Sequence, residues 1–113
     1  MAQAWDHARS CVTKWGGRPE DYIDIEHWFD GSKEYMGDFR HRALRHHAVG
    51  IAECRRRFGI TLINSDGRTV PVQLIAERHV IEDHGRIPTL QDWFRCIRPE
   101  PWMNEPKKLF PGE

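Results

Sequence analysis

The 113-residue chain has no net charge, no long apolar run and only three cysteines. Zero formal charge excludes an overall field that would draw the protein onto nucleic acid or a membrane, so such binding needs a local patch. The absence of a long apolar run excludes a transmembrane helix, and the amino-terminal stretch lacks the features of a signal peptide. Widely spaced cysteines without a C-x-x-C pair predict a cytoplasmic protein with reduced thiols.

Compact catalytic motifs are missing as well. The sequence contains no phosphate-binding loop and no H-E-x-x-H zinc motif. The stretch 64–67, NSDG, resembles a fragment of a calcium loop, but the closing glutamate of such a loop is absent. Any chemistry must therefore come from residues that are far apart in the chain, and the sequence leaves open whether the protein is an enzyme.

What the sequence does contain is a series of amphipathic segments. They predict an α+β fold, a small helical domain with one long central helix and one β-hairpin. The hairpin is expected over Ile60–Val70, around the turn signal Asp66-Gly67. Helices are expected over Ala2–Trp15, part of Arg18–Asp30, Lys33–Phe58, Pro71–His84 and Thr89–Ile97. Residues 1–98 are predicted to form a single globular domain, and residues 99–113 an extended proline-rich C-terminal tail.

The predicted central helix, Lys33–Phe58, separates into two faces on a helical wheel. His47 falls on the inward face, with Arg40 beside it, and His46 falls on the boundary. The other inward positions are Met36, Phe39, Ala43, Ile51, Cys54 and Phe58. The outward face carries His41, Arg42, Arg45 and Arg56.

Inward-facing histidines and a carboxylate predict a metal site. His79 and Asp83 lie four residues apart on one predicted helix, so they share a face and can hold one ion. His47 and His7 would add ligands from two other helices, with Cys11 as a further candidate. Such ligands suit zinc or another divalent transition metal such as iron or manganese. With an open coordination position the site would be hydrolytic, with Glu82 or Glu77 as a nearby base.

A buried polar network is the alternative interpretation of the same residues. Core histidines are commonly satisfied by a carboxylate or a backbone carbonyl without any metal. His79 would then pair with Asp83, and Arg40 with Asp83 or Glu82. Because an unpaired buried polar group costs roughly 1–3 kcal/mol, some partner is expected in either case.

The outward face of the predicted central helix suggests a partner surface. His41, Arg42, Arg45 and Arg56 form a basic patch that could contact nucleic acid or an acidic partner protein. The alternative is a solvated helix face whose charges pair with acids elsewhere, for example in the region 20–24. No partner can be named from these residues.

Several strings resemble a family of small bacterial and phage proteins of unknown function, the DUF6915 type. They are KWGG and EDY within 14–22, HWFD at 27–30, DFRHRALRHHAVGI at 38–51, NSDGRTVPV at 64–72, ERHVIEDHGRIPTLQDWF at 77–94 and PWM at 101–103. The resemblance implies that His7, His47, His79 and Asp83 are motif positions and that His84 and Cys11 are not. It implies no activity.

The function expected from the sequence is therefore binding, by a small bacterial or phage protein whose polar His/Asp/Arg cluster can bind a metal. A small metal-dependent hydrolase that uses the same residues is the first alternative. Recognition of nucleic acid or an acidic partner through the basic face is the second.

Overall fold

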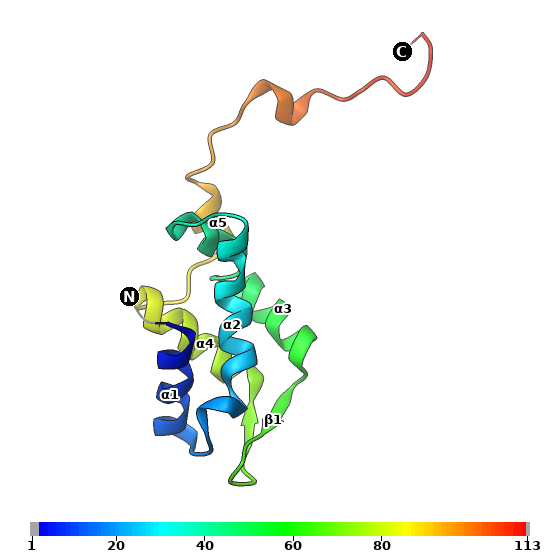
Figure 1. Ribbon diagram of the computed structural model, residues 1–113. Helices are drawn as coiled ribbons and strands as arrows, with labels where there is room; N and C mark the ends of the chain where they lie inside the picture. The colour runs from blue at the N-terminus through cyan, green and yellow to red at the C-terminus, as the bar shows by residue number, and fades with distance from the viewer. Residues whose placement is uncertain (1–2, 113) are drawn as a thin grey trace.

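The structure is a computed structural model that describes residues 3–112, and it confirms the predicted α+β class (Figure 1). Ala2, where the first helix was expected to begin, lies outside the described residues. The α-helices are α1 (Ala4–Trp15), α2 (Ile23–Asp30), α3 (Ala48–Phe58), α4 (Val72–His84) and α5 (Leu90–Phe94). Short 3₁₀ segments are η1 (Pro19–Asp21), η2 (Gly31–Glu34), η3 (Phe39–Leu44) and η4 (Pro101–Asn104). The strands are β1 (Thr61–Ile63) and β2 (Thr69–Pro71).

The predicted hairpin forms and is tied to the end of α1. β1 and β2 pair antiparallel, with Leu62 opposite Val70. The side-chain oxygen of Asn64 accepts hydrogen bonds from the backbone of the turn, and its amide donates to the Trp15 carbonyl. Two strands alone are marginally stable, so these bonds and the fully buried Val70 anchor the hairpin to the helices.

Helix α4 organises the core because it packs against α1, α2 and α3. Pro71, the last residue of β2, is its N-cap, and Gly85 ends it in the left-handed conformation at φ 74°. The face turned to the other helices carries Val72, Ile75, Ala76, His79 and Val80, all buried. A histidine therefore lies within the apolar stripe of the central packing helix.

The predicted long helix over Lys33–Phe58 is wrong. The segment forms η2, η3 and the shorter helix α3, with irregular turns between them. Met36 and Phe39, expected to face the core, are 38% and 61% exposed. Local bonds compete with a continuous helix here: the Asp38 carboxylate accepts from the backbone of Arg40 and starts η3.

Contacts from a distant segment fix the break between η3 and α3. The indole of Trp93 donates to the His46 carbonyl at 2.9 Å, and the Ala48 amide donates to the Pro88 carbonyl at 2.9 Å. His47 then caps α3, because its Nδ1 accepts from the Gly50 amide at 2.9 Å. The backbone groups that would continue the helix are therefore already satisfied by other partners.

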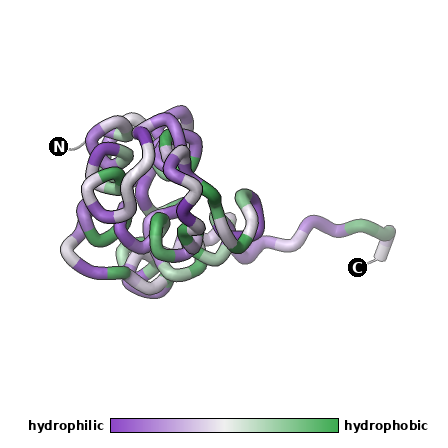
Figure 2. Tube along the Cα trace, turned by 90° about the horizontal axis from the view of Figure 1, so that it is seen from below, coloured by the Kyte–Doolittle hydropathy of each residue, from purple (hydrophilic) through white to green (hydrophobic). Residues whose placement is uncertain are grey.

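The C-terminal segment leaves the body of the molecule as an extended chain interrupted by η4 (Figures 1 and 2). All residues from Arg95 to Gly112 are exposed, including Trp102 at 71% and Phe110 at 68%. The division into a domain of residues 1–98 and a tail of residues 99–113 stays a prediction. Within residues 3–112, every helix is too short or too polar to cross a membrane.

Replacing Gly50 by alanine should strongly destabilise the fold. A Cβ at this position would lie 1.7 Å from the carbonyl oxygen of Arg45, which is backbone and cannot rotate away. The junction between η3 and α3 would have to open, so we expect a loss of more than about 3 kcal/mol in the free energy of unfolding. Urea denaturation measures it.

The matched control is Gly37→Ala, where an added Cβ meets nothing within 4 Å. That variant should stay within about 0.5 kcal/mol of the parent protein. Equal stability of the Gly50 and Gly37 variants would contradict the close approach at the junction.

Candidate metal centre

Four side chains from three parts of the chain converge in the interior. Asp30 ends α2, His46 lies in the link between η3 and α3, and His79 and Asp83 lie one turn apart on α4. One nitrogen or oxygen from each lies within 4.8 Å of the other three. The two imidazoles are fully buried, the Asp83 side chain is 3% exposed and that of Asp30 is 14% exposed. The cluster is thus a compact buried set of donors that metals prefer.

The spacing of these atoms resembles a coordination shell. His46 Nε2, His79 Nε2 and Asp83 Oδ2 are separated by 3.1–3.2 Å in all three pairs. Asp30 Oδ1 lies 3.4 Å from His79 Nε2 and 3.9 Å from His46 Nε2. In tetrahedral zinc sites with bonds of about 2.0–2.1 Å, neighbouring ligand atoms lie roughly 3.3–3.4 Å apart. The set therefore needs only small shifts to surround a zinc-sized ion.

Hydrogen bonds alone satisfy this arrangement less completely. Each Nε2 has one hydrogen or one lone pair, directed along the ring plane. If both rings donate to Asp83 Oδ2, their two N–H groups lie side by side with the nitrogens 3.2 Å apart. In addition, Nδ1 of His46 is buried without a hydrogen-bond partner among the described residues. A cation between the two Nε2 atoms and Asp83 Oδ2 would replace both N–H hydrogens and so remove the repulsion between them.

Glu26 orients His79 from the opposite side. Its Oε2 lies 2.5 Å from His79 Nδ1, and both side chains are fully buried. The other oxygen of Glu26 accepts from the Cys11 thiol at 3.3 Å. A carboxylate on the remote ring nitrogen is the usual support of a metal-binding histidine, because it fixes the ring and the tautomer. The contact with Glu26 leaves Nε2 of His79 directed at the cluster.

His7 occupies an outer layer of the same site. Its Nε2 lies 3.2 Å from Asp83 Oδ1, and its Nδ1 lies 3.0 Å from Glu82. His7, Glu26 and His79 also form a group spaced closely enough for an ion. Because Glu26 already contacts His79 Nδ1, the donors of the four-residue cluster are the better candidates for a metal.

The pKa values of the two central histidines, His46 and His79, shift in opposite directions. Burial alone would lower the pKa of His79, but bonds to the Asp30, Asp83 and Glu26 carboxylates outweigh it and raise the pKa to about 11. Burial dominates at His46 and lowers its pKa to about 4. Burial opposes ionisation of Asp83, yet bonds from the histidines hold its pKa well below the usual range. Without a metal, His79 therefore carries the compensating positive charge.

Comparison with known proteins identifies the family but no activity. A family model described as a domain of unknown function (DUF6915) matches residues 2–103. The chain belongs to this family. No curated protein and no solved structure matches it. The resemblance expected from the sequence is therefore confirmed.

Three of the four metal ligands expected from sequence lie in or beside the cluster. His79 and Asp83 are members, and His7 is in contact with Asp83. His47 is not: its Nδ1 caps α3 and its Nε2 faces the Ala43 carbonyl at 2.9 Å. His47 is therefore the N-cap of α3, at the end of the link between η3 and α3.

The expected polar network is only partly formed in the DUF6915 domain. Glu82 takes part through His7 and also accepts from Ser10. Arg40 does not, because it lies on the surface and pairs with Asp38 at 2.8 Å. Arg42 takes the place expected for Arg40, with its guanidinium 3.7 Å from Asp83.

The predicted basic surface does not exist as one face. His41 is 2% and Arg42 is 9% exposed. The ring of His41 contacts that of His46, and the guanidinium of Arg42 contacts Asp83. Arg45 turns to the face of Trp28. Arg56 remains exposed and pairs with Glu53. The cause is the break in the helix, which places these side chains on different sides of the domain.

Sequence reasoning missed Glu26, Asp30 and His46. Glu26 and Asp30 are four residues apart on α2, as His79 and Asp83 are on α4, so both pairs project from one helix face. That repeated spacing was a signal available in the sequence. No comparable local signal identified His46, whose orientation depends on the break before α3.

The metal-free protein, kept in chelator, should lose stability as the pH falls below 6.5. Folded His46 stays neutral until about pH 4, whereas in the unfolded chain it takes up a proton near 6.5. The unfolded state then binds more protons, so acid favours unfolding by up to about 3 kcal/mol from this residue. Its neighbour His79 contributes fully below pH 6.5 and loses its contribution only as the pH rises toward 11. Urea denaturation at pH 7.0, 5.5 and 4.5 measures the slope.

His46→Gln should reduce this pH dependence, to which His41, His47 and His84 also contribute because burial lowers the pKa of each. His27→Gln should leave it unchanged, because His27 is exposed. Identical slopes for the His46 variant and the parent protein would show that His46 is not the neutral buried group described above.

Proposed function

We propose that this protein binds one divalent transition metal ion through Asp30, His46, His79 and Asp83. The observation that carries the proposal is the convergence of two imidazole nitrogens and two carboxylate oxygens on one point. Two nitrogens and two oxygens in tetrahedral spacing favour zinc, and iron or manganese would be accommodated if a position opened.

The charge of the site supports the proposal. Asp30, Asp83 and Glu26 place three carboxylates in the interior, and protonated His79 offsets one of them. The guanidinium of Arg42 lies close enough to Asp83 to offset a second carboxylate with or without a metal. The metal-free site therefore keeps one uncompensated negative charge, whereas a divalent ion with neutral His79 offsets the remaining two carboxylates. Buried charges are costly without such compensation. A metal therefore suits this interior better than a single proton does.

Tag-free protein, reconstituted with zinc and desalted, should carry about one equivalent of metal by elemental analysis. His46→Ala and His79→Ala should lose it, because each removes one of the two buried imidazole ligands. His47→Ser is the matched control: serine can still cap α3, and His47 contributes nothing to the cluster, so this variant should retain the metal.

A metal-free protein with an intact fold would contradict the proposal and favour the polar network. Loss of metal in the His47 variant, with retention in the His46 variant, would restore the ligand set expected from the sequence instead.

Glu26→Gln tests the supporting layer. The variant keeps an oxygen near His79 but loses the charge that fixes the ring, so zinc affinity should fall by roughly 10–100-fold. Competition with a chromogenic chelator measures the affinity. Asp6→Asn, on the exposed start of α1, is the control. If the Glu26 variant bound zinc with unchanged affinity, His79 would not be a ligand that Glu26 orients.

Metal-dependent hydrolysis is a second candidate, favoured by the position of Asp30. This residue lines an open pocket of about 350 Å³ together with Trp5 and Lys33. If Asp30 leaves the ion, water can occupy its position, and three protein ligands plus water is the usual catalytic arrangement. Lys33 would favour an anionic ester as substrate.

The zinc-loaded protein should then hydrolyse bis(p-nitrophenyl) phosphate, and chelation should abolish turnover. Asp30→Ala should retain the metal and at least part of the activity, whereas His79→Ala should lose both. Metal binding without turnover of this ester or of p-nitrophenyl acetate would leave a closed, structural site.

A further inference from the structure

A second site lies on the other side of α2, facing away from the histidine cluster. It is a pocket of about 580 Å³ lined by residues of α2, η2 and α3 and by Tyr35 and Arg45 from the segments between them. Ligand pockets for small molecules have volumes of roughly 300–1,000 Å³. The lining residues are Asp24, His27, Trp28, Gly31, Glu34, Tyr35, Arg45, Arg57 and Phe58.

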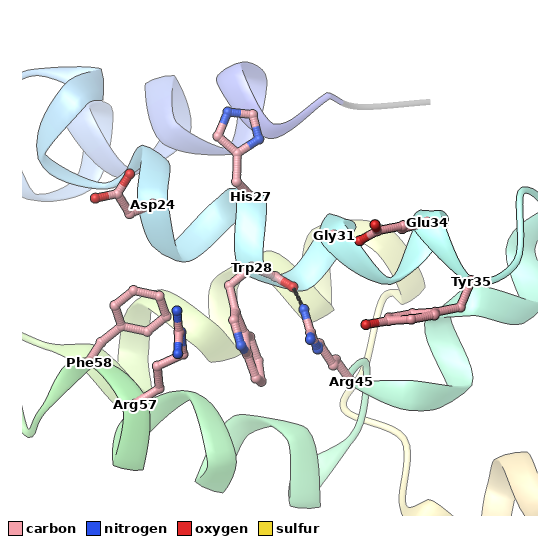
Figure 3. A pocket seen from close by; sticks show the side chains of 9 residues that line it. All are labelled: Asp24, His27, Trp28, Gly31, Glu34, Tyr35, Arg45, Arg57 and Phe58. Carbon is pink, nitrogen blue, oxygen red and sulfur yellow. Dashed lines mark hydrogen bonds between the residues drawn. The ribbon is translucent and has the colours of Figure 1, made fainter.

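Planar aromatic and cationic side chains alternate across the space between α2 and α3. Figure 3 shows Phe58, Arg57, Trp28, Arg45 and Tyr35 in that order across the pocket. The Arg45 guanidinium lies 4.5 Å from the centre of the Trp28 ring, and that of Arg57 lies 5.6 Å from the centre of Phe58. Such interleaving is typical of surfaces that stack bases and contact phosphates.

The two arginines are available for an anionic ligand. Within residues 3–112, neither Arg45 nor Arg57 forms an ion pair with a carboxylate. Arg45 is also held in place, because it donates to the Trp28 carbonyl as well as stacking on its ring. A guanidinium fixed in this way loses little entropy when it binds phosphate.

Two carboxylates lie across the pocket from the arginines. Figure 3 shows Asp24 and Glu34 on the side of α2 and η2, opposite the row of Arg57, Trp28 and Arg45. Neither acid forms an ion pair in the described part of the chain. Carboxylates accept hydrogen bonds from the exocyclic amino groups of bases, cytosine N4 above all. Opposed acids and arginines therefore match a ligand with an amino-bearing base at one end and a phosphate at the other.

We propose that this pocket binds a nucleoside phosphate whose base carries an exocyclic amino group, either as a free nucleotide or within a single strand. Arg57 and Arg45 contact the phosphate, Tyr35 offers a face for the base, and Glu34 or Asp24 accepts from its amino group. Tyr35 is 71% exposed, which leaves its ring free to stack. The site is independent of the metal proposed above.

Fluorescence anisotropy with labelled ten-residue deoxycytidine and thymidine strands tests the proposal. The cytosine strand should bind at least fivefold more tightly, because thymine lacks the amino group. Two phosphate contacts predict a salt slope of roughly −1.4, so affinity should fall about sevenfold between 50 and 200 mM salt.

Arg57→Ala and Tyr35→Ala should each weaken binding of the cytosine strand at least tenfold. Arg56→Ala is the matched control, since it removes the same charge from the neighbouring position outside the pocket. Glu34→Gln should reduce the preference for cytosine. Competition by unlabelled cytidine monophosphate distinguishes the two sources. If the monophosphate displaces the labelled strand at the same concentration as the unlabelled strand does, the ligand is a free nucleotide. If only the unlabelled strand displaces it, the ligand is single-stranded nucleic acid.

Equal effects of Arg56→Ala and Arg57→Ala would reduce the binding to general charge attraction and overturn the site. So would equal affinity for the two strands with no effect of Glu34→Gln, or tighter binding of a glutamate-rich peptide than of either strand. All of these variants are at exposed positions, so loss of the fold does not confound the result.

Discussion

The burial of Asp83 is the constraint on which the rest of the structure depends. Its two oxygens face different partners, His7 and Arg42 on one side and the two central histidines on the other. A carboxylate that is almost fully buried is tolerated only if nearly every lone pair meets a donor or a cation. Helix α1, the η3 region and α4 must therefore each present a polar group at one point, and α4 is central to the fold because it carries two of the cluster residues.

The link between η3 and α3 connects this constraint to the outer parts of the fold. Trp93 and Pro88 bond to the backbone on either side of His47, so the helix cannot run through this point. The interruption directs His46 into the cluster and buries Arg42 beside it. Helix α5, which has no buried residue of its own, thereby contributes to the geometry of the candidate metal centre.

Helix α2 separates the two candidate sites of this DUF6915 domain. Glu26 and Asp30 project from it toward the histidine cluster, whereas Trp28 and Asp24 line the pocket on the other side. Phe29 lies between the two sites and stacks on His79 at 4.8 Å. A buried site rich in imidazole and a surface pocket rich in arginine and aromatics serve different ligands, so the two proposals stand on separate residues.

The sequence by itself determined the local elements, because their signals lie within a few residues. The Asp66-Gly67 hairpin, α4 between Pro71 and Gly85, and the pairing of His79 with Asp83 on one face all follow from short-range geometry. Only the tertiary structure decided the fate of residues 33–58. Helical periodicity there was strong, but the bonds that break the helix come from residues about 40 positions later in the chain. For that reason the sequence predicts His47 as a ligand, whereas His46 faces the cluster, and it predicts Arg42 on the surface, whereas Arg42 is buried.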